Sequence, residues 1–448
     1  MTVGDAASGT RYRLDRGLQR FGRAIVGGSP LKLFRVTDAG AAVVDRIAAG
    51  EAAPQSALVT ALAEAGAIHP EPDHSPFAPH DVTIVVPTYG VPRRVPPGAM
   101  LVDDGSPVPV AGATLRLEHN RGPGAARNGG LAQVTTPLVA FVDTDVELWA
   151  GWLEPLLLHF ADPRVALVAP RVTTTAEPSP VAWYERSNSP LDLGPEPARI
   201  RAGTRVSYVP AAAIVCRVDA LREIGGFDES LRFGEDVDLV WRLDETGWRC
   251  RYEPAAEVGH DPRSSWGAWA RQRITYGAST APLARRHPGA LAPIRMSGWS
   301  VATWALAAVE RPIAGSLVGL GSAAALIRKL PDVPPRAAFE LAARGNLQAG
   351  DQIAKAVRRA WWPIVAVAAL RSRTARRILF AAALAARHPV RLADDLAYSV
   401  GVWSGIVAER TLAPLVPEIS SWPGRRAAAQ AVNAARDTAD CDRYDHSP

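Results

Sequence analysis

Residues 138–145 read LVAFVDTD, an apolar run followed by two aspartates that are separated by one residue. The run has the length and apolar composition of a buried parallel strand. Residues two positions apart in an extended strand point to the same side, so Asp143 and Asp145 can converge on one divalent cation that bridges phosphate oxygens. An Asp-x-Asp sequence alone is common on protein surfaces, but its position at the end of a buried strand predicts a binding site.

Two earlier segments predict further strands of the same parallel sheet. Residues 81–89 read DVTIVVPTY, and residues 99–106 read AMLVDDGS, so the second strand runs into two carboxylates and a turn-forming glycine. The carboxyl ends of parallel strands face a ligand crevice in open α/β sheets. Taken alone, the second motif would also suit a capped turn. About a dozen residues with three prolines join the two strands, which predicts a tight connection without a full helix.

A glycine-rich segment follows these strands. Residues 119–130 read HNRGPGAARNGG, a turn that enters a helix and carries two arginines. Such a segment can present backbone N–H groups and guanidinium charge to a diphosphate, although glycine-rich loops also serve unrelated turns. Together with the strand ends, it makes Arg127 and Asn128 candidates for binding a phosphorylated ligand.

A later segment places two carboxylates where a helix begins. Residues 208–217 predict another strand, and residues 234–243 read GEDVDLVWRL, a helix with an apolar face. Glu235 and Asp236 at its start are either favourable charges at the positive end of the helix dipole or a base that takes a proton from an acceptor hydroxyl. Asp238 lies about 200° further around the helix, so it should point away from Asp236.

The composition is that of a folded protein with more than one domain. The chain has 448 residues, 48% of them hydrophobic, and a net charge of +5. A single core rarely grows beyond roughly 250–300 residues. The charge excess is small for this length, so nucleic acid is not an expected partner. Three cysteines without metal-ligand spacing, and an N-terminus without secretory character, lead us to expect a cytoplasmic location.

Composition divides the chain into three regions. We expect a small winged-helix-like domain at residues 1–78, an α/β domain at residues 79–290, and a helical region at residues 291–448. In the first region, a helix after Thr37-Asp38, another after Pro54 and a wing after Gly66 resemble small peptide-recognition domains. A structural cap on the α/β domain explains this region equally well.

The third region contains apolar stretches that call for a membrane test. Charged residues interrupt the stretches at residues 297–327 and 360–386, and each run is shorter than the roughly 20 residues that cross a bilayer. Three arrangements are open for these stretches. In order of preference, they are helices packed on the α/β domain, peripheral membrane contact through residues 297–386, and a true membrane span.

In order and spacing, the motifs of residues 82–277 resemble the family 2 glycosyltransferases, which have the nucleotide-diphospho-sugar transferase (GT-A) fold. The resemblance implies an inverting, metal-dependent transfer with Mg²⁺ or Mn²⁺ as cofactor. It also implies the following roles: nucleoside contacts by Thr88, Tyr89 and Asp103; metal and diphosphate binding by Asp143 and Asp145, completed by His260; diphosphate contacts by Arg271 and Arg273; and a general base at Asp236 with Glu235 at the acceptor.

The flanking regions resemble the glycosyltransferases of the mycofactocin system, at residues 12–15, 26–40, 62–70, 398–405 and 410–415. That resemblance implies UDP-glucose as donor and a peptide-derived redox cofactor precursor as acceptor. Two alternatives stay open: a membrane-associated polysaccharide or glycolipid glycosyltransferase, and a peptide-binding scaffold with a degenerate transferase fold. Intact Asp143, Asp145 and Asp236 favour an enzyme over the scaffold.

Overall fold

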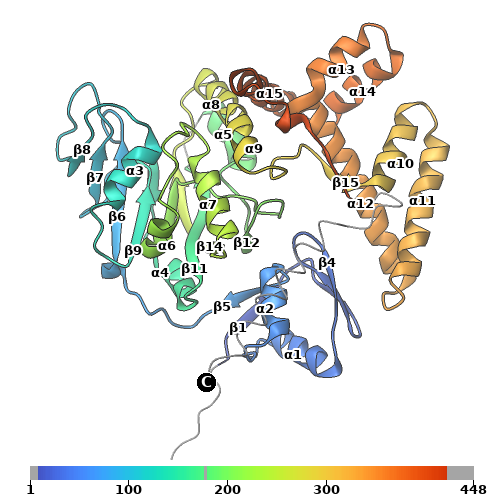
Figure 1. Cartoon of the computed structure of the whole chain (residues 1–448), viewed down its shortest axis with the longest axis horizontal. Coiled ribbons are helices and arrows are strands. Elements are labelled where there is room, and N and C mark those ends of the chain that lie inside the picture. The colour runs from blue at the N-terminus through green and yellow to red at the C-terminus, as the bar shows by residue number, and fades with distance from the viewer. Residues whose placement is uncertain (1–8, 176–178, 421–448) are drawn as a thin grey trace, which may run out of the picture. The chain divides into compact units, whose positions relative to one another are not determined.

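The structure, a computed structural model, describes residues 9–175 and 179–420. These residues divide into two compact units, one up to residue 291 and one from residue 292 onward (Figure 1). Cys216 and Cys250 are free and buried in the first unit, whereas Cys441 lies outside the described residues.

The first unit begins with a small α/β segment that has its own core. Its elements are β1 (Arg11–Leu14), β2 (Gln19–Phe21), β3 (Ala24–Gly27), β4 (Lys32–Arg35), α1 (Asp38–Ala48), α2 (Ala57–Glu64) and β5 (Ile68–Glu71). Thr37 and Ser56 cap the two expected helices by accepting backbone hydrogen bonds. Strands β2, β3 and β4 form one antiparallel sheet, and β1 pairs with β5. The winged-helix resemblance stays a prediction.

A nine-stranded mixed sheet forms the centre of the first unit. Its order is β10-β14-β11-β13-β9-β6-β7-β8, and β12 pairs with β14. The bounds are β6 (Val82–Thr88), β7 (Met100–Asp103), β8 (Leu115–Arg116), β9 (Leu138–Val142), β10 (Val146–Leu148), β11 (Val165–Thr174), β12 (Ala198–Ile200), β13 (Ala213–Arg217) and β14 (Arg249–His260). Strand β6 is parallel to β7 and β9, and β13 is antiparallel to both β9 and β11. Because β11 is parallel to β14, the carboxyl ends of β6, β7, β9 and β14 reach the same edge.

Helices cover both faces of this sheet (Figure 1). They are η1 (Pro79–Asp81), α3 (Pro123–Leu131), α4 (Glu154–Leu158), η2 (His159–Ala161), α5 (Pro180–Asn188), α6 (Val218–Glu223), α7 (Glu235–Glu245), α8 (Trp266–Ala278) and α9 (Thr280–Arg286). The expected α/β class is confirmed, and the connection between β6 and β7 has no helix, as its length predicted.

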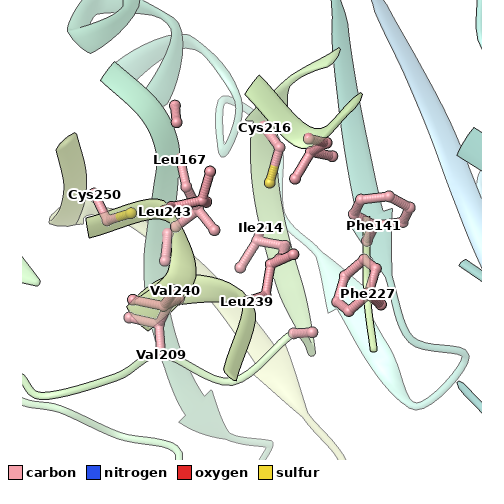
Figure 2. Packing of buried hydrophobic residues seen from close by; sticks show 14 of the residues in the cluster. Phe141, Leu167, Val209, Ile214, Cys216, Phe227, Leu239, Val240, Leu243 and Cys250 are labelled. Atoms are coloured by element: carbon pink, nitrogen blue, oxygen red, sulfur yellow. The ribbon is translucent and has the colours of Figure 1, made fainter. Parts of the chain in front are cut away.

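Strand β9 shows why the sheet is buried on both faces. Val139 and Phe141 pack into one core with α3, α6 and α7, whereas Leu138, Ala140 and Val142 pack into a second core with α4. Side chains alternate along a strand, so one apolar run serves both cores. Figure 2 shows the first core, where the rings of Phe141 and Phe227 pack edge to face. Their centroids are 5.2 Å apart.

The second unit is helical, as expected for the C-terminal region. Its elements are β15 (Arg295–Ser297), α10 (Gly298–Ala308), α11 (Pro312–Lys329), α12 (Pro335–Ala356), the π-helical turn η3 (Val357–Trp361), α13 (Trp362–Ala369), α14 (Arg373–Leu384), α15 (Pro389–Glu409), η4 (Ala413–Leu415) and β16 (Glu418–Ser420). Asp395 of α15 accepts hydrogen bonds from Nε of Arg358 and of Arg359, each at 2.6 Å, which ties α15 to η3. Within the described part of the chain, none of the helices combines the length and apolarity that crossing a membrane requires.

Candidate active site

The two aspartates after β9 lie in a turn. Strand β9 ends at Val142, the amide of Asp143 donates to the carbonyl of Ala212 at 2.9 Å, and the amide of Val146 donates back to the carbonyl of Asp143 at 3.1 Å. The expectation that Asp143 and Asp145 share one face of an extended strand is therefore wrong. The turn instead directs Asp143 toward Arg127 and Asp145 toward His260.

Arg127 of α3 connects this turn to the first residue of α7. Its Nη2 lies 2.8 Å from Oδ1 of Asp143, and its Nη1 lies 2.7 Å from Oε1 of Glu235. The guanidinium also stacks on the ring of Phe227, with Cζ 5.4 Å from the centroid. The side chain is only 3% exposed. We expected Arg127 to contact the donor. In the structure both of its terminal nitrogens bind carboxylates, and little of the guanidinium group can reach a ligand.

Asp236 has a different environment from Glu235. It is half-buried and accepts hydrogen bonds from the amides of Val237 and Ala211, at 2.8 and 3.2 Å. Burial raises the pKa of Asp236 more than Arg127 lowers it. Burial and the neighbouring Asp236 also raise the pKa of Glu235, despite its ion pair with Arg127. Asp236 is thus the more accessible carboxylate and has a raised proton affinity, which suits a proton acceptor.

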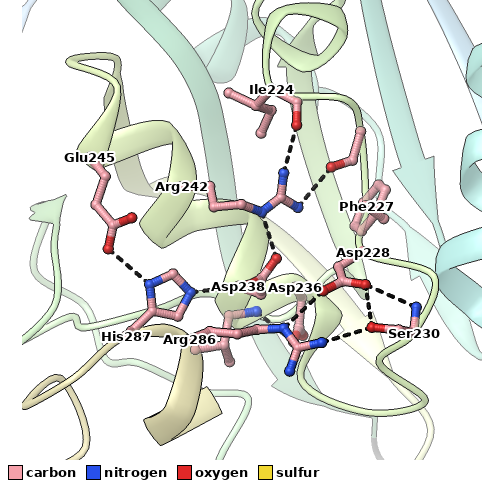
Figure 3. Close-up of polar contacts among 12 residues, drawn as sticks. Ile224, Phe227, Asp228, Ser230, Asp236, Asp238, Arg242, Glu245, Arg286 and His287 are labelled. Carbon is pink, nitrogen blue, oxygen red and sulfur yellow. Dashed lines mark hydrogen bonds and ion pairs between the residues drawn. The ribbon is translucent and has the colours of Figure 1, made fainter. Parts of the chain in front are cut away.

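Asp238 points away from Asp236, as the helical spacing predicted. Its carboxylate accepts from Nε of Arg242 at 2.6 Å and lies 3.0 Å from Nε2 of His287. Figure 3 shows this network, in which His287 also reaches Glu245 at 2.8 Å and Arg242 donates to the carbonyl of Ile224. Asp238 therefore joins α7 to the segment after α9.

Asp145 and His260 form the best candidate for a metal site. Strand β14 ends at His260, and its Nε2 lies 3.4 Å from Oδ2 of Asp145. The pKa of Asp145 is lowered to about 2, because His260 and Arg263 outweigh the effect of burial. Among the described residues, no three His, Cys, Asp or Glu side chains are grouped as metal ligands. Two protein ligands fit an ion such as Mg²⁺ or Mn²⁺ that takes its other ligands from substrate phosphates and water.

The residues expected at the nucleoside separate into exposed and enclosed groups. Tyr89 is 59% exposed at the end of β6, where its ring is free to stack. The hydroxyl of Thr88 is buried and donates to the carbonyl of Gly90 at 3.1 Å. Asp103 is fully buried, which favours its neutral form, but hydrogen bonds led by those from Ser106 lower its pKa to about 2. Asp103 therefore holds the loop after β7 through hydrogen bonds within the protein, whereas we expected it to contact the nucleoside directly.

Asn128, Arg271 and Arg273 were also expected to contact the donor. The side-chain amide of Asn128 pairs with both the N–H and the carbonyl of Phe227, at 2.8 and 2.9 Å. Arg273 is buried, lies 3.2 Å from Oε1 of Glu185 and stacks on Trp269. Both side chains hold elements together, and their expected contacts with the diphosphate stay predictions. Arg271 is exposed on α8.

The structure adds three arginines that the motifs did not indicate. Arg93 and Arg94, in the irregular loop after β6, donate to Oδ2 of Asp261 at 3.2 and 2.7 Å, and the amide of Arg94 donates to the carbonyl of Thr144. Arg263 lies 3.5 Å from Oδ2 of Asp145. The adjacent Arg93 and Arg94, just after a strand end, were a sequence signal for a site with positive charge. The fold of their irregular loop could not be predicted from the sequence. These guanidinium groups place positive charge beside the Asp143–Asp145 turn.

Comparison with known proteins extends over nearly the whole chain. The family model described as Glycosyl transferase family 2 matches residues 101–225. The pre-mycofactocin glycosyltransferase of Mycobacterium tuberculosis is 39% identical, and the match covers 94% of this chain and 100% of that protein. Polypeptide N-acetylgalactosaminyltransferase 3 of Taeniopygia guttata is 28% identical over 34% of this chain and 28% of its own length. A solved mannosyltransferase from Pyrobaculum calidifontis, in complex with GDP-Man and Mn2+, covers 74% of this chain and 91% of its own, with a TM-score of 0.37 and 16% identity.

Proposed function

Because the chain belongs to the family 2 glycosyltransferases, and along nearly its whole length to the group of the pre-mycofactocin glycosyltransferase, we propose that it transfers glucose from UDP-glucose to a pre-mycofactocin acceptor. Family membership confirms the expected transferase domain with the GT-A fold and favours an enzyme over a peptide-binding scaffold. The observation that carries the proposal is the 39% identity over 94% of this chain and the whole length of the relative. Such an acceptor would be the expected peptide-derived precursor of a redox cofactor.

The donor would lie at the carboxyl edge of the sheet. Exposed Tyr89 offers a ring for the base, and the arginines beside the Asp143–Asp145 turn offer charge for the diphosphate. A divalent cation held by Asp145 and His260 would stabilise the negative charge that develops on the leaving diphosphate. Mg²⁺ and Mn²⁺ both suit a carboxylate and an imidazole with phosphate oxygens as further ligands.

The acceptor hydroxyl would be deprotonated by Asp236. In an inverting displacement, the hydroxyl oxygen forms a bond to the anomeric carbon while the bond from that carbon to the diphosphate oxygen breaks. The hydroxyl proton passes to one base, and the protein forms no covalent intermediate. Asp236 supports this role because it is half-buried, has a raised pKa and receives hydrogen bonds from neutral backbone amides. Glu235 is less suited, because the ion pair with Arg127 occupies it.

The second candidate is transfer to a glycolipid at a membrane surface. Exposed apolar side chains in the second unit favour peripheral contact through residues 297–386, namely Ile313, Leu317, Leu320, Ile364, Val367, Leu370, Phe380 and Leu384. Basic residues accompany them in α14 and just before it. An apolar face with flanking Lys and Arg is typical of helices that lie on anionic membranes.

One experiment tests both candidates. Purified full-length protein is incubated with UDP-glucose and Mn²⁺, and with pre-mycofactocin or with a lipid extract, and the products are separated by mass spectrometry. We expect hexose additions to pre-mycofactocin. Transfer to lipid alone would support the membrane candidate, and transfer to pre-mycofactocin only from another nucleotide sugar would correct the donor.

A further inference from the structure

A cavity lies in the first unit, away from the candidate active site. Its volume is about 360 Å³, and its lining comes partly from the N-terminal segment, with Tyr12 and Thr60, and partly from the beginning of β14, with Arg249 and Arg251. The candidate metal ligand His260 ends the same strand. A strand of 12 residues spans roughly 35–40 Å, so the cavity and the active site lie at opposite edges of the sheet.

Arg251 is the unusual residue of this cavity. It is 3% exposed, and neither its Nε nor its Nη1 has a hydrogen-bond partner among the described residues. A buried arginine is normally paired, because removing a guanidinium group from water is unfavourable unless acceptors replace the water. Burial and the adjacent Arg199 lower the pKa of Arg251 to about 10.

The acidic groups around Arg251 are engaged with other arginines. Glu64 forms ion pairs with Arg199 and Arg249, Asp162 accepts from Arg249, and Asp244 lies 2.7 Å from Arg199. Arg199 stands directly opposite Arg251 in the pairing of β12 with β14, a position where like charges destabilise a sheet. The cavity therefore contains a cation whose hydrogen bonds the protein itself leaves incomplete.

We propose that this cavity binds a small organic or inorganic anion through Arg251. The acceptor group would be a carboxylate or a phosphate, which are the groups that match guanidinium donors. A volume of this size is within the range of small-molecule sites. Pro70, Pro72 and Val165 add apolar wall, so a compact body can accompany the charged group.

Bound anion would connect the N-terminal segment to the sheet, because both contribute walls to the cavity. A ligand that binds the folded state and not the unfolded state stabilises the fold in proportion to the logarithm of its concentration. The inference does not depend on the transfer reaction, since Arg251 and the candidate active site lie at opposite ends of β14.

Thermal unfolding of the full-length protein tests the site. Sodium phosphate and sodium succinate are titrated separately, against sodium chloride at equal ionic strength. We expect a saturable rise of about 2–6 °C in Tm with at least one of the two anions beyond that with chloride. A rise with phosphate alone assigns a phosphate ligand, and a rise with succinate alone assigns a carboxylate.

Two variants and a control separate the cavity from the surface. Arg251→Met removes the cation, and Thr60→Phe fills the cavity without changing a charge; both should abolish the rise. Arg232→Met, at an exposed arginine on another part of the sheet domain, should retain it. If Arg251→Met does not fold, the titrations of the natural protein and of Thr60→Phe decide the question. An equal response to phosphate, succinate and chloride in the natural protein, or an unchanged rise in Thr60→Phe, would overturn the proposal.

Discussion

Arg127 and Glu235 form a buried ion pair, in which Nη1 of the arginine lies 2.7 Å from Oε1 of the glutamate and both side chains are less than a tenth exposed. The same guanidinium binds Asp143. One cation therefore fixes the start of α7 relative to the Asp143–Asp145 turn. Among the described residues, Asp236, the next residue of α7, has no direct ion pair of its own.

Replacing Arg127 should mainly destabilise the fold. Arg127→Met leaves Glu235 buried without its counter-ion, and breaking a buried pair in this way typically costs about 3–5 kcal/mol. Urea unfolding should show a loss of that size in the free energy of unfolding. Arg232→Met, at an exposed arginine, should change it by less than about 0.5 kcal/mol. A loss of donor affinity at unchanged stability would instead restore Arg127 as a donor contact.

Asp236→Asn should lower kcat by about 10²–10⁴-fold while donor and metal binding stay near normal. The natural enzyme should gain activity as pH rises through the raised pKa of Asp236, because a base acts only when deprotonated. That acidic limb of the kcat profile should lie above the ordinary carboxyl pKa of 3.8 and should be absent from the variant. Wild-type kcat in Asp236→Asn, with a large loss in Glu235→Gln, would move the role to Glu235.

Removal of divalent metal should abolish transfer. EDTA is added to the full-length enzyme, and activity is restored with Mg²⁺ or Mn²⁺. Calorimetric titration with UDP should show that Asp145→Ala and His260→Ala lose the metal-dependent part of binding, whereas Asp219→Ala, at an exposed carboxylate of α6, retains it. Full activity after complete chelation would contradict the assignment of both ligands.

Stability should fall as pH rises above about 6.5, in part through His287. Burial alone lowers the pKa of His287, but hydrogen bonds with Asp238 and Glu245 outweigh burial and raise it above 6.5. A raised folded-state pKa contributes stability that is complete below about pH 6.5 and is lost as pH rises through the folded-state value. Urea unfolding across this range should show a smaller decline in His287→Gln than in the natural protein. His80→Gln, at an exposed histidine, should decline as the natural protein does.

Deletion of residues 1–78 should destabilise the sheet domain in addition to any effect on the acceptor. The deletion removes Glu64, which pairs with the buried Arg199 and Arg249. Acceptor selection by this segment is therefore better tested with the intact chain and point variants on its exposed face. A truncated protein as stable as the full chain would show that these ion pairs contribute nothing.

The amino-acid sequence by itself determined strands β6, β7 and β9, the start of α7 and the edge at which the carboxylates gather. Strands β6, β7 and β9 lie within one residue of the expected segments, and Glu235 begins α7 with Asp236 next to it, as expected. These features are encoded locally: apolar residues on both faces of a strand, prolines and glycines at its ends, and acidic residues at a helix start. A resemblance carried by such motifs was therefore enough to identify the transferase domain.

Only the tertiary structure decided which polar groups meet. Arg127 and Glu235 are 108 positions apart, so no local pattern reveals that the arginine pairs with this carboxylate. Asn128 likewise uses its side-chain amide within the protein, because packing brings it to Phe227, 99 positions away. The unpaired nitrogens of Arg251 also result from packing between distant segments. The nearby Glu64 forms its ion pairs with Arg199 and Arg249 and not with Arg251. Side-chain periodicity fixes which residues face a core or an edge, whereas the pairing of charges depends on distances that exist only once distant segments have packed together.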